Sequence, residues 1–453
     1  MSGGRAETDL KTLAEAMVDA ARAAGADQAD ALAVNGRSVS IDVRGGSLEL
    51  AERAEGVEIG LRVLIGGRQA CVSSSDHGAA AIARMAERAV AMAREAPVDD
   101  SLGLAEPRLL GRQRDAVGLE LDDEGPDPTP EALQDMALRA EAAALAAKGI
   151  AQVEAAAAGF SRRATWLAAS NGFSGGFERS THSISAVAIT GEGLGMERDY
   201  AGEARAWAAD LPAPEEIGAL AAERTLARAG SKKPPTGAFP IIFDRRVSAS
   251  LISHLLAAVN GAAVARGASW LRDALGQQVL PAGMTLIEDP LRPRFPYSRP
   301  FDAEGLAQSR RKIVDKGVLQ GWALDMATGR KLGMDSTGSA WRGVASGPSP
   351  AYSNVILCPG DQSLDDLMAD MGRGLIVTSM LGASINATTG DYSRGASGFW
   401  VENGQIAWPV NECTIAGNLR DMLMTLRAAN DALPWRATEV PGLLVEGMTV
   451  AGA

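Results

Sequence analysis

Two spacings of hydrophobic residues alternate along the first half of the chain, one helical and one typical of strands. Over residues 8–24 the apolar positions Leu10, Leu13 and Met17 recur at helical intervals, and Gly25 provides a stop signal. This segment is therefore predicted to form a helix.

Between residues 29 and 75 the pattern changes to short alternating runs, which favour strands. The runs are separated by dipeptides that favour two-residue hairpin turns, namely Asn35-Gly36, Gly45-Gly46 and Gly66-Gly67. We expect an antiparallel meander in which the chain reverses at each dipeptide. A helix over about 78–94 then completes this helix–meander–helix unit.

A second unit of the same order follows an acidic, proline-bearing link at 95–128, which is expected to be an exposed loop. Thr129-Pro130 opens the next predicted helix, since proline suits the first turn. The predicted elements are a helix over 129–147, strands over 151–169, 173–191 and 199–210, and a helix over 214–229. The repeated order indicates an internal duplication, although no repeat is visible residue by residue.

The segment SKKPPTG at 231–237 marks the predicted domain boundary, because consecutive prolines continue neither a helix nor a central strand. We expect an N-terminal α+β domain over 1–232 and a C-terminal β-rich domain over 233–453. The first of these could divide further into subunits at 1–95 and 128–230.

The C-terminal part is rich in glycine, proline and short apolar runs. AFPIIF and GLIVTSML (374–381) predict buried strands, 245–260 predicts a helix, and Ser363 begins a capping-box pattern for a helix that ends at Gly372. The expected fold class is α+β. Antiparallel sheets with flanking helices come first, and a barrel- or sandwich-like domain with few helices follows.

The charge balance excludes several classes of function. The formal net charge is −12, and no long segment is rich in lysine or arginine. This argues against binding to nucleic acid or to an anionic membrane surface. The sequence has no signal-peptide-like start, no apolar run of about 18 residues, and three widely separated cysteines. These features predict a cytoplasmic protein.

Histidines are too few and too scattered for a recognisable zinc motif. His77, His182 and His254 are far apart, and neither HExxH nor CxxC occurs. His254 lies in SASLISHLLAAVNG beside small residues, outside the apolar stripe of the predicted helix. This placement favours a histidine that is hydrogen-bonded at a packing interface, and a lone metal ligand is the alternative.

Candidate nucleophiles lack their partners. Ser309 and Lys312 match the SxxK pattern of serine acyl-enzymes, but no basic residue precedes the Thr-Gly pairs that could serve as its third element. Cys413 has no histidine nearby in the sequence, so a buried cysteine is the favoured interpretation. No P-loop or GxGxxG motif is present.

The stretch GDYSRGASGFWVENG at 390–404 combines glycines with polar side chains. Glycine permits positive φ angles and close approach of another backbone. The candidate ligand contacts are Asp391, Tyr392, Arg394 and Ser397, and Asn403-Gly404 predicts a hairpin turn. Local physics alone favours a rigid loop and hairpin in which the aspartate and the arginine pair internally.

The same stretch, with WPVNECTIAGNLRDML after it, resembles the PmbA (TldE) branch of the TldD/PmbA family. The segments SRPFDAEGLAQSRRKIVDKGVLQGW, IFDRRVSASLISHLLAAVNG and VEGMTVAG also resemble segments of that family, so the resemblance covers nearly the whole chain. It implies a metalloprotease built from a TldD-type subunit and a PmbA-type subunit. The TldD-type subunit carries an H-E-x-x-x-H zinc helix and a cysteine near the C-terminus.

The resemblance also implies substrates and a second name for the family. Unfolded proteins or peptides are expected to enter a closed chamber as extended strands and to be degraded there. The leader of a modified peptide antibiotic is one such substrate. The family has also been named a modulator of DNA gyrase.

The zinc residues of the family do not carry over to this chain. His254 matches the first ligand position, but Leu255 replaces the glutamate and Val259 replaces the second histidine. The closing stretch ATEVPGLLVEGMTVAG has no cysteine. The resemblance therefore implies no catalytic residue and no metal site here, with His254 at most a vestigial first ligand.

These observations predict a non-catalytic subunit without a cofactor of its own. It would form a heterodimer with a zinc-bearing TldD-like subunit, or a homodimer when alone, and an extended peptide would contact Asp391, Tyr392, Arg394 and Ser397. Direct contact with nucleic acid or membrane is not expected. Two alternatives stay open. One is an independent hydrolase that uses Cys413, or Ser309 with Lys312; the other is an interaction protein that binds a gyrase-directed toxin or antitoxin.

Overall fold

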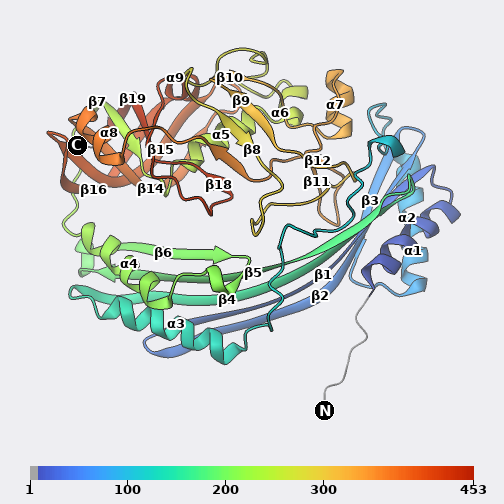
Figure 1. Ribbon diagram of the computed structural model, residues 1–453, viewed down its shortest axis with the longest axis horizontal. Helices are drawn as coiled ribbons and strands as arrows, with labels where there is room; N and C mark the ends of the chain where they lie inside the picture. The colour runs from blue at the N-terminus through green and yellow to red at the C-terminus, as the bar shows by residue number, and fades with distance from the viewer. Residues whose placement is uncertain (1–8, 453) are drawn as a thin grey trace.

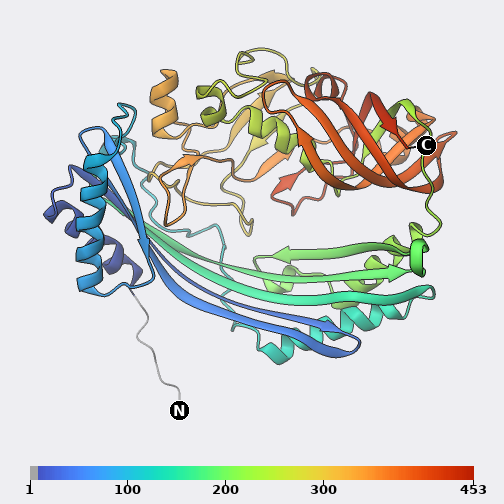
Figure 2. The same cartoon turned by 180° about the vertical axis from the view of Figure 1, so that it is seen from behind.

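A long, curved antiparallel sheet faces a β-rich body in the computed structural model, which describes residues 9–452 (Figure 1). The view from behind shows that the concave side of the sheet is turned toward this body (Figure 2). The first half of the sheet and its helices are α1 (Leu10–Ala23), β1 (Gln28–Arg44), β2 (Ser47–Ile65), β3 (Arg68–Ser74) and α2 (Ala79–Glu95).

The second half repeats this order of elements. It comprises α3 (Pro130–Leu145), β4 (Ile150–Ala169), β5 (Ser174–Thr190), β6 (Glu197–Arg205) and α4 (Pro214–Ala227), with short 3-10 turns at Gly193–Gly195 and Ala208–Asp210. The strands lie in the order β3-β2-β1-β4-β5-β6, so β1 and β4 join two three-stranded meanders into one sheet. The helix–strand–strand–strand–helix order predicted for both halves is confirmed, although the third strand of the second half ends at Arg205 and not at residue 210.

Each half packs a pair of helices on the sheet through small residues. Ala14, Ala21, Ala86, Ala89 and Ala93 of α1 and α2 are almost fully buried against the first half. Alanines on α3 and α4 pack in the same way against Phe160 and Ile184 in the second half. Such small side chains let helix and sheet approach closely, which explains how a chain with few aromatics builds these layers.

The prediction of a turn at Asn35-Gly36 is wrong, because β1 runs through this dipeptide without interruption. Gly36 pairs with Gly56 on one side and with Arg163 on the other. Two neighbouring strands therefore hold the dipeptide extended, and this pairing overrides its local preference for a turn. The turns at Gly45-Gly46 and Gly66-Gly67 are confirmed, since all four glycines have positive φ.

The link at 95–128 is less exposed than predicted. It contains only a 3-10 turn at Pro107–Leu109, yet Leu119 and Leu121 are buried. Gly176 and Ser180 of β5 donate backbone hydrogen bonds to the carbonyl groups of Arg114 and Leu121. The link thus covers the part of the β5 edge that β6 does not reach.

A small closed barrel forms the centre of the C-terminal part. Its strands are β7 (Gly237–Phe243), β14 (Gly374–Ile385), β15 (Asp391–Glu402), β16 (Gln405–Asn418) and β19 (Leu443–Ala451). They follow one another in the order β16-β15-β14-β7-β19, and pairing of β16 with β19 closes the ring. The predicted barrel-like, β-rich fold and the hairpin turn at Asn403-Gly404 are confirmed.

A second sheet and several short helices surround the barrel. The sheet has the order β10-β9-β8-β13-β18, with β8 (Leu286–Glu288), β9 (Arg311–Asp315), β10 (Val318–Leu319), β13 (Val355–Leu357) and β18 (Thr438–Glu439). The remaining elements are α6 (Gly261–Ala265), α7 (Met326–Leu332), α8 (Leu364–Met371), α9 (Leu419–Met424), β11 (Ala340–Trp341), β12 (Ser349–Pro350) and β17 (Arg427–Ala428). The capping box at Ser363 is confirmed.

The helix predicted over 245–260 begins later and is interrupted. Residues 244–248 form a turn in which the Asp244 carbonyl accepts from Val247 and Ser248, and α5 spans Ala249–Ala258. Asn260 is extended, and its side chain caps α6 by accepting from the Ala262 amide. Within residues 9–452, no helix has both the length and the apolar character needed to cross a membrane.

Candidate functional site

His254, Tyr392 and Arg394 meet where α5 packs against the barrel. Tyr392 and Arg394 are two apart on β15 and therefore share a face, and the Tyr392 ring lies edge-on to His254 with centroids 5.9 Å apart. Burial lowers the pKa of His254, and the positive charge of Arg394 lowers it further. His254 is thus held as a neutral imidazole near physiological pH.

The polar atoms of this group have few partners. The Tyr392 hydroxyl donates to the Met380 sulfur at 3.3 Å, and burial raises the pKa of Tyr392 to about 12. Arg394 Nε donates to the Gly382 carbonyl at 2.7 Å. His254 Nε2 is buried and has no hydrogen-bond partner among residues 9–452. The hydrogen bond predicted for His254 is therefore not found at this nitrogen.

The helix around His254 does not fit a zinc site. Leu255 and Val259 are fully buried and belong to the main hydrophobic core, where they pack with Leu251 and Ile252. Among residues 9–452, no group of three or more His, Cys, Asp or Glu side chains is arranged to hold a metal ion. The positions one and five residues after His254 could supply a carboxylate and a second ligand. They are occupied by the core residues Leu255 and Val259.

The other two candidates from the 390–404 stretch lie apart from His254. Asp391 is exposed and accepts from Thr389 Oγ1 at 2.6 Å and from Asn418 Nδ2 at 3.1 Å, which lowers its pKa. Ser397 is buried, and its hydroxyl accepts from Arg228 Nη2 at 3.0 Å, which ties the barrel to the end of α4. The four predicted peptide contacts therefore do not form one cluster, and their role in binding stays a prediction.

The candidate nucleophiles are not activated in the structure. Cys413 is buried in β16, its sulfur donates to the Ala396 carbonyl at 3.1 Å, and burial raises its pKa to about 11. Lys312 forms an ion pair with Asp315 at 2.9 Å, and Ser309 lies in an exposed loop. A thiol with a raised pKa is a poor nucleophile near neutral pH, and Lys312 is already paired.

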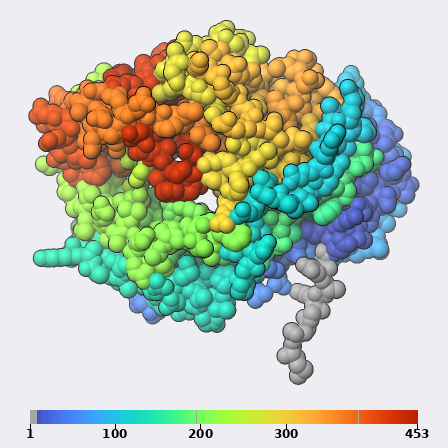
Figure 3. Space-filling view, in the orientation of Figure 1, coloured from blue at the N-terminus to red at the C-terminus, as the bar shows by residue number. Residues whose placement is uncertain are grey.

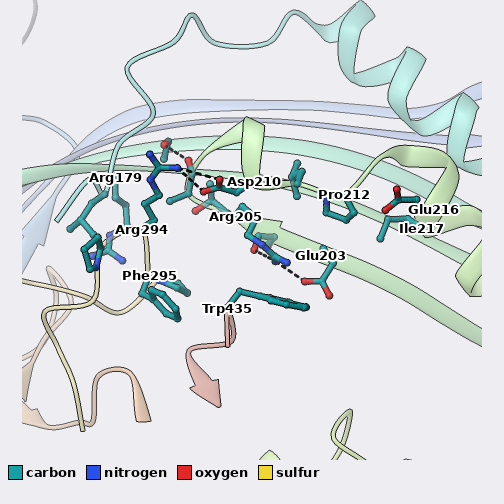
Figure 4. A pocket seen from close by; sticks show the side chains of 18 of the residues that line it. Arg179, Glu203, Arg205, Asp210, Pro212, Glu216, Ile217, Arg294, Phe295 and Trp435 are labelled. Carbon is teal, nitrogen blue, oxygen red and sulfur yellow. Dashed lines mark hydrogen bonds and ion pairs between the residues drawn. The ribbon is translucent and has the colours of Figure 1, made fainter. Parts of the chain in front are cut away.

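A large cavity between the sheet and the C-terminal part was not anticipated from the sequence. It has a volume of about 810 Å³. The molecular surface is hollowed where the red and yellow C-terminal segments face the green ones of the sheet (Figure 3). Its apolar walls are Leu121, Leu211, Ile217, Leu220, Phe295 and Trp435 (Figure 4). The proline-rich stretch LRPRFPYSRP, which supplies Phe295, is the sequence signal that could have indicated a rigid cavity wall.

Arginines give this cavity a mixed character. Arg205 forms an ion pair with Glu203 at 2.7 Å and lies over the Trp435 ring at 5.1 Å, and Arg294 pairs with Asp210 at 3.1 Å (Figure 4). Burial lowers the pKa of Arg179 to about 10, and nearby arginines add to the effect. Arg179 stays charged at neutral pH without a carboxylate partner among the described residues. The cavity thus combines apolar walls with a cation, Arg179, that donates to the Ser298 carbonyl at 2.6 Å and that no described carboxylate balances.

Comparison with known families accounts for most of the chain. Residues 236–452 match the PmbA/TldA metallopeptidase C-terminal domain, residues 123–229 the central domain, and residues 29–93 domain 1. The chain is 35% identical to the metalloprotease PmbA of Escherichia coli O157:H7, over 98% of this chain and 97% of that protein. It is also 35% identical, over the same shares, to the metalloprotease PmbA homolog of Haemophilus influenzae.

Solved structures show the same architecture. A proposed modulator of DNA gyrase from Bacteroides thetaiotaomicron superposes with a TM-score of 0.89 at 29% identity, covering 99% of this chain and 100% of that one. TldE from Thermococcus kodakarensis superposes with a TM-score of 0.83 at 21% identity, covering 97% and 99%. At that lower identity the second likeness concerns the fold alone.

Proposed function

Because this chain belongs to the PmbA/TldD metallopeptidase family, we propose that it is the supporting, PmbA-type subunit of a two-subunit metalloprotease. It would dock a TldD-type subunit that binds zinc and cleaves, and it would hold an extended or unfolded peptide for cleavage. It would bind no metal itself. Trimming of the leader of a peptide antibiotic is one form that this activity could take.

The observation that carries the proposal is the burial of Leu255 and Val259. A zinc peptidase needs a carboxylate general base and several ligands around the metal. In this chain the residues one and five positions after His254 are core side chains with no exposed surface. For this reason we assign peptide cleavage to the partner subunit.

The outer edge of β6, which lies next to the large cavity, supports a role in holding peptide. The Tyr200 amide donates to the Asp199 side chain at 2.7 Å and its carbonyl accepts from Arg224 at 3.0 Å, so Tyr200 points its backbone away from β5. By the alternation of an antiparallel ladder, Gly202 and Ala204 direct their backbone groups the same way. An extended peptide could pair with this edge of β6 and place an apolar side chain in the cavity.

An uncovered part of β2 supports a role in docking another subunit. Residues 47–58 of β2, which we name the open arm, pair with β1 on one side only, because β3 begins its pairing at Ile59. All residues of the open arm except Val57 are exposed, including Leu48 and Leu50. A long edge strand left bare in a single chain is usually covered in an assembly.

The deciding experiment is hydrolysis of an unfolded peptide by this chain, by the TldD-type subunit of the same genome, and by their mixture. We expect no cleavage by this chain alone, and cleavage by the mixture that exceeds that of the partner alone and is abolished by a chelator. The structural reason is that the partner supplies the metal and this chain supplies peptide-binding and docking surface.

Two outcomes would contradict the proposal. Cleavage by this chain alone would show an independent hydrolase, and the variants Cys413→Ala and Ser309→Ala would then locate its nucleophile. Cleavage by the partner that this chain neither increases nor binds to would show that the two proteins do not act together.

A further inference from the structure

A second pocket lies between the first half of the sheet and the C-terminal part, away from the large cavity. Its volume is about 340 Å³, within the range of about 300–1,000 Å³ typical of small-molecule sites. β2 and β3 form one wall, and α6, α7 and β12 form the opposite wall. The charged residues that line it are Arg62, Asp99, Arg266, Glu304, Asp325 and Lys331.

The most buried cation that lines this pocket, Arg62, is already matched by a carboxylate. Arg62 Nε donates to Asp30 Oδ2 at 2.7 Å, and Arg342 Nη1 contacts Asp30 Oδ1. Arg62, Asp30 and Arg342 are 3%, 2% and 5% exposed. Asp30 thus holds both guanidinium groups, and neither of them contacts Glu304 or Asp325 directly.

Two buried carboxylates in the pocket each keep one oxygen free. Glu304 is 8% exposed; its Oε2 accepts from the Met326 amide at 2.8 Å, and its Oε1 accepts from no residue between 9 and 452. Asp325 is 2% exposed; its Oδ1 accepts from the Thr328 amide at 2.7 Å, and its Oδ2 has no donor in the same range. Both residues line the pocket, so a charged donor on a ligand could form charge-assisted hydrogen bonds with these two oxygens.

The negative charges of neighbouring carboxylates disfavour the ionised form of Glu304. Burial raises the pKa of Glu304 to about 8, the nearby charges of Asp302 and Asp325 raise it as well, and Arg62 opposes them. Asp302 offers no atom to a ligand, because its oxygens accept from the amides of Glu304, Leu306 and Ala340. At neutral pH Glu304 therefore holds a proton. A cation beside it would favour the ionised form and release that proton.

From these contacts we propose that the pocket binds a small molecule with a primary ammonium group, which donates to Glu304 Oε1 and Asp325 Oδ2. An ammonium group has three N–H donors, and two of them can bind the two free carboxylate oxygens. The volume suits a free amino acid or a dipeptide. This site does not depend on the subunit role proposed above.

The mouth of the pocket carries positively charged side chains, which suit a negatively charged group of the ligand. Lys331 lies there in an ion pair with Asp99 at 2.8 Å, and both side chains are more than a third exposed. Arg266 is exposed and has no partner among residues 9–452. A ligand carboxylate could reach these cations while its ammonium group contacts Glu304. The combination favours α-amino acids and dipeptides over simple amines.

Isothermal titration calorimetry of the full chain with glycyl-leucine tests this proposal. We expect binding at pH 7 whose heat differs between phosphate and Tris buffers, because up to about one proton leaves Glu304 when the ammonium group binds. N-acetyl-glycyl-leucine lacks the ammonium group and is expected not to bind. Equal binding of the acetylated dipeptide would overturn the proposal, and so would binding of neither probe. This test uses the unaltered protein.

A pair of matched variants locates the site. Glu304→Gln keeps an acceptor for the Met326 amide but cannot ionise, so it is expected to bind roughly ten- to a hundredfold more weakly and without proton release. Glu106→Gln makes the same change at an exposed position outside the pocket and is expected to bind like the unaltered chain. Unchanged affinity in Glu304→Gln would contradict the assignment.

A longer peptide tests whether the ammonium group belongs to a free amino acid or dipeptide, or to the N-terminus of a peptide chain. An octapeptide with a free N-terminus is expected to bind more weakly than glycyl-leucine, because the pocket has room for little more than two residues. Equal or tighter binding of the octapeptide would assign the site to the ends of peptide chains and would contradict a site for free amino acids and dipeptides.

Discussion

Asp30 joins the sheet to the C-terminal part through a buried cluster of charges. It is buried, and it accepts from Arg62 of β2 and from Arg342, which follows β11. Burial lowers the pKa of both arginines, to about 10 for Arg342, and a guanidinium group stays charged in proteins at neutral pH. One carboxylate therefore compensates two buried cations from distant parts of the chain.

We expect Asp30→Asn to reduce the free energy of unfolding by about 3–5 kcal/mol, because it leaves two buried guanidinium groups without a counter-charge. Thermal unfolding of the variant would measure this loss. The control is Asp76→Asn, since the pair of Asp76 with Arg84 is 3.9 Å long and about two-thirds exposed. A change within about 0.5 kcal/mol is expected there. Similar losses in both variants would show that burial of the Asp30 cluster adds nothing.

At the scale of the element, β2 changes character along its length. Residues 59–65 lie between β1 and β3 and are mostly buried, whereas residues 47–58 form the open arm. The sequence predicted strands and turns here correctly at Gly45-Gly46 and Gly66-Gly67, because those turns depend on local backbone preferences. It missed the continuity through Asn35-Gly36, because only pairing with β4 shows that β1 is an inner strand.

Two glycines of β2 differ in what surrounds them. A Cβ atom on Gly60 would lie 2.0 Å from the Val344 carbonyl oxygen, whereas nothing lies within 4 Å of the corresponding position on Gly56. We expect Gly60→Ala to destabilise the protein by about 1–3 kcal/mol through overpacking, and Gly56→Ala to have little effect. Thermal unfolding of the two variants tests this. Equal shifts would mean that the segment around Val344 moves freely away from the sheet.

At the scale of the whole molecule, the curved sheet and loops of the C-terminal part line the large cavity, and the open arm lies at an outer edge of the sheet. Leu48 and Leu50 are 49% and 46% exposed on the arm. Such positions contribute little to the stability of the single chain but become buried if a second subunit covers the arm.

We therefore expect the double variant Leu48→Ser, Leu50→Ser to bind the TldD-type subunit at least about tenfold more weakly, with an unchanged unfolding temperature. Analytical ultracentrifugation of the mixed subunits measures this. The control is Met92→Ser on α2, which is 48% exposed at a distance from the arm in sequence and is expected to bind normally. Normal binding by the double variant would exclude the arm from the subunit interface.

The candidate site was predictable only in part. Sequence placed His254 on a helix and Tyr392 with Arg394 in a glycine-rich loop before a hairpin. In the structure Tyr392 and Arg394 belong to β15, and they lie beside His254. The sequence did not show that Asp391 and Ser397 lie apart from this group. The position of Ser397 depends on a bulge between Ala396 and Gly398 and on its contact with Arg228. The sequence also missed both pockets, since each is lined by residues from distant segments.

The sequence by itself determined the elements and the family. Alternating hydrophobic residues, glycine turns and capping residues act over a few positions, so they are legible along one chain. The loss of the zinc residues at Leu255 and Val259 is equally local. The tertiary structure alone decided which charges share a pocket. Arg62, Glu304 and Asp325 meet only because the sheet packs against the C-terminal part, and the burial that raises the pKa of Glu304 exists only after that packing.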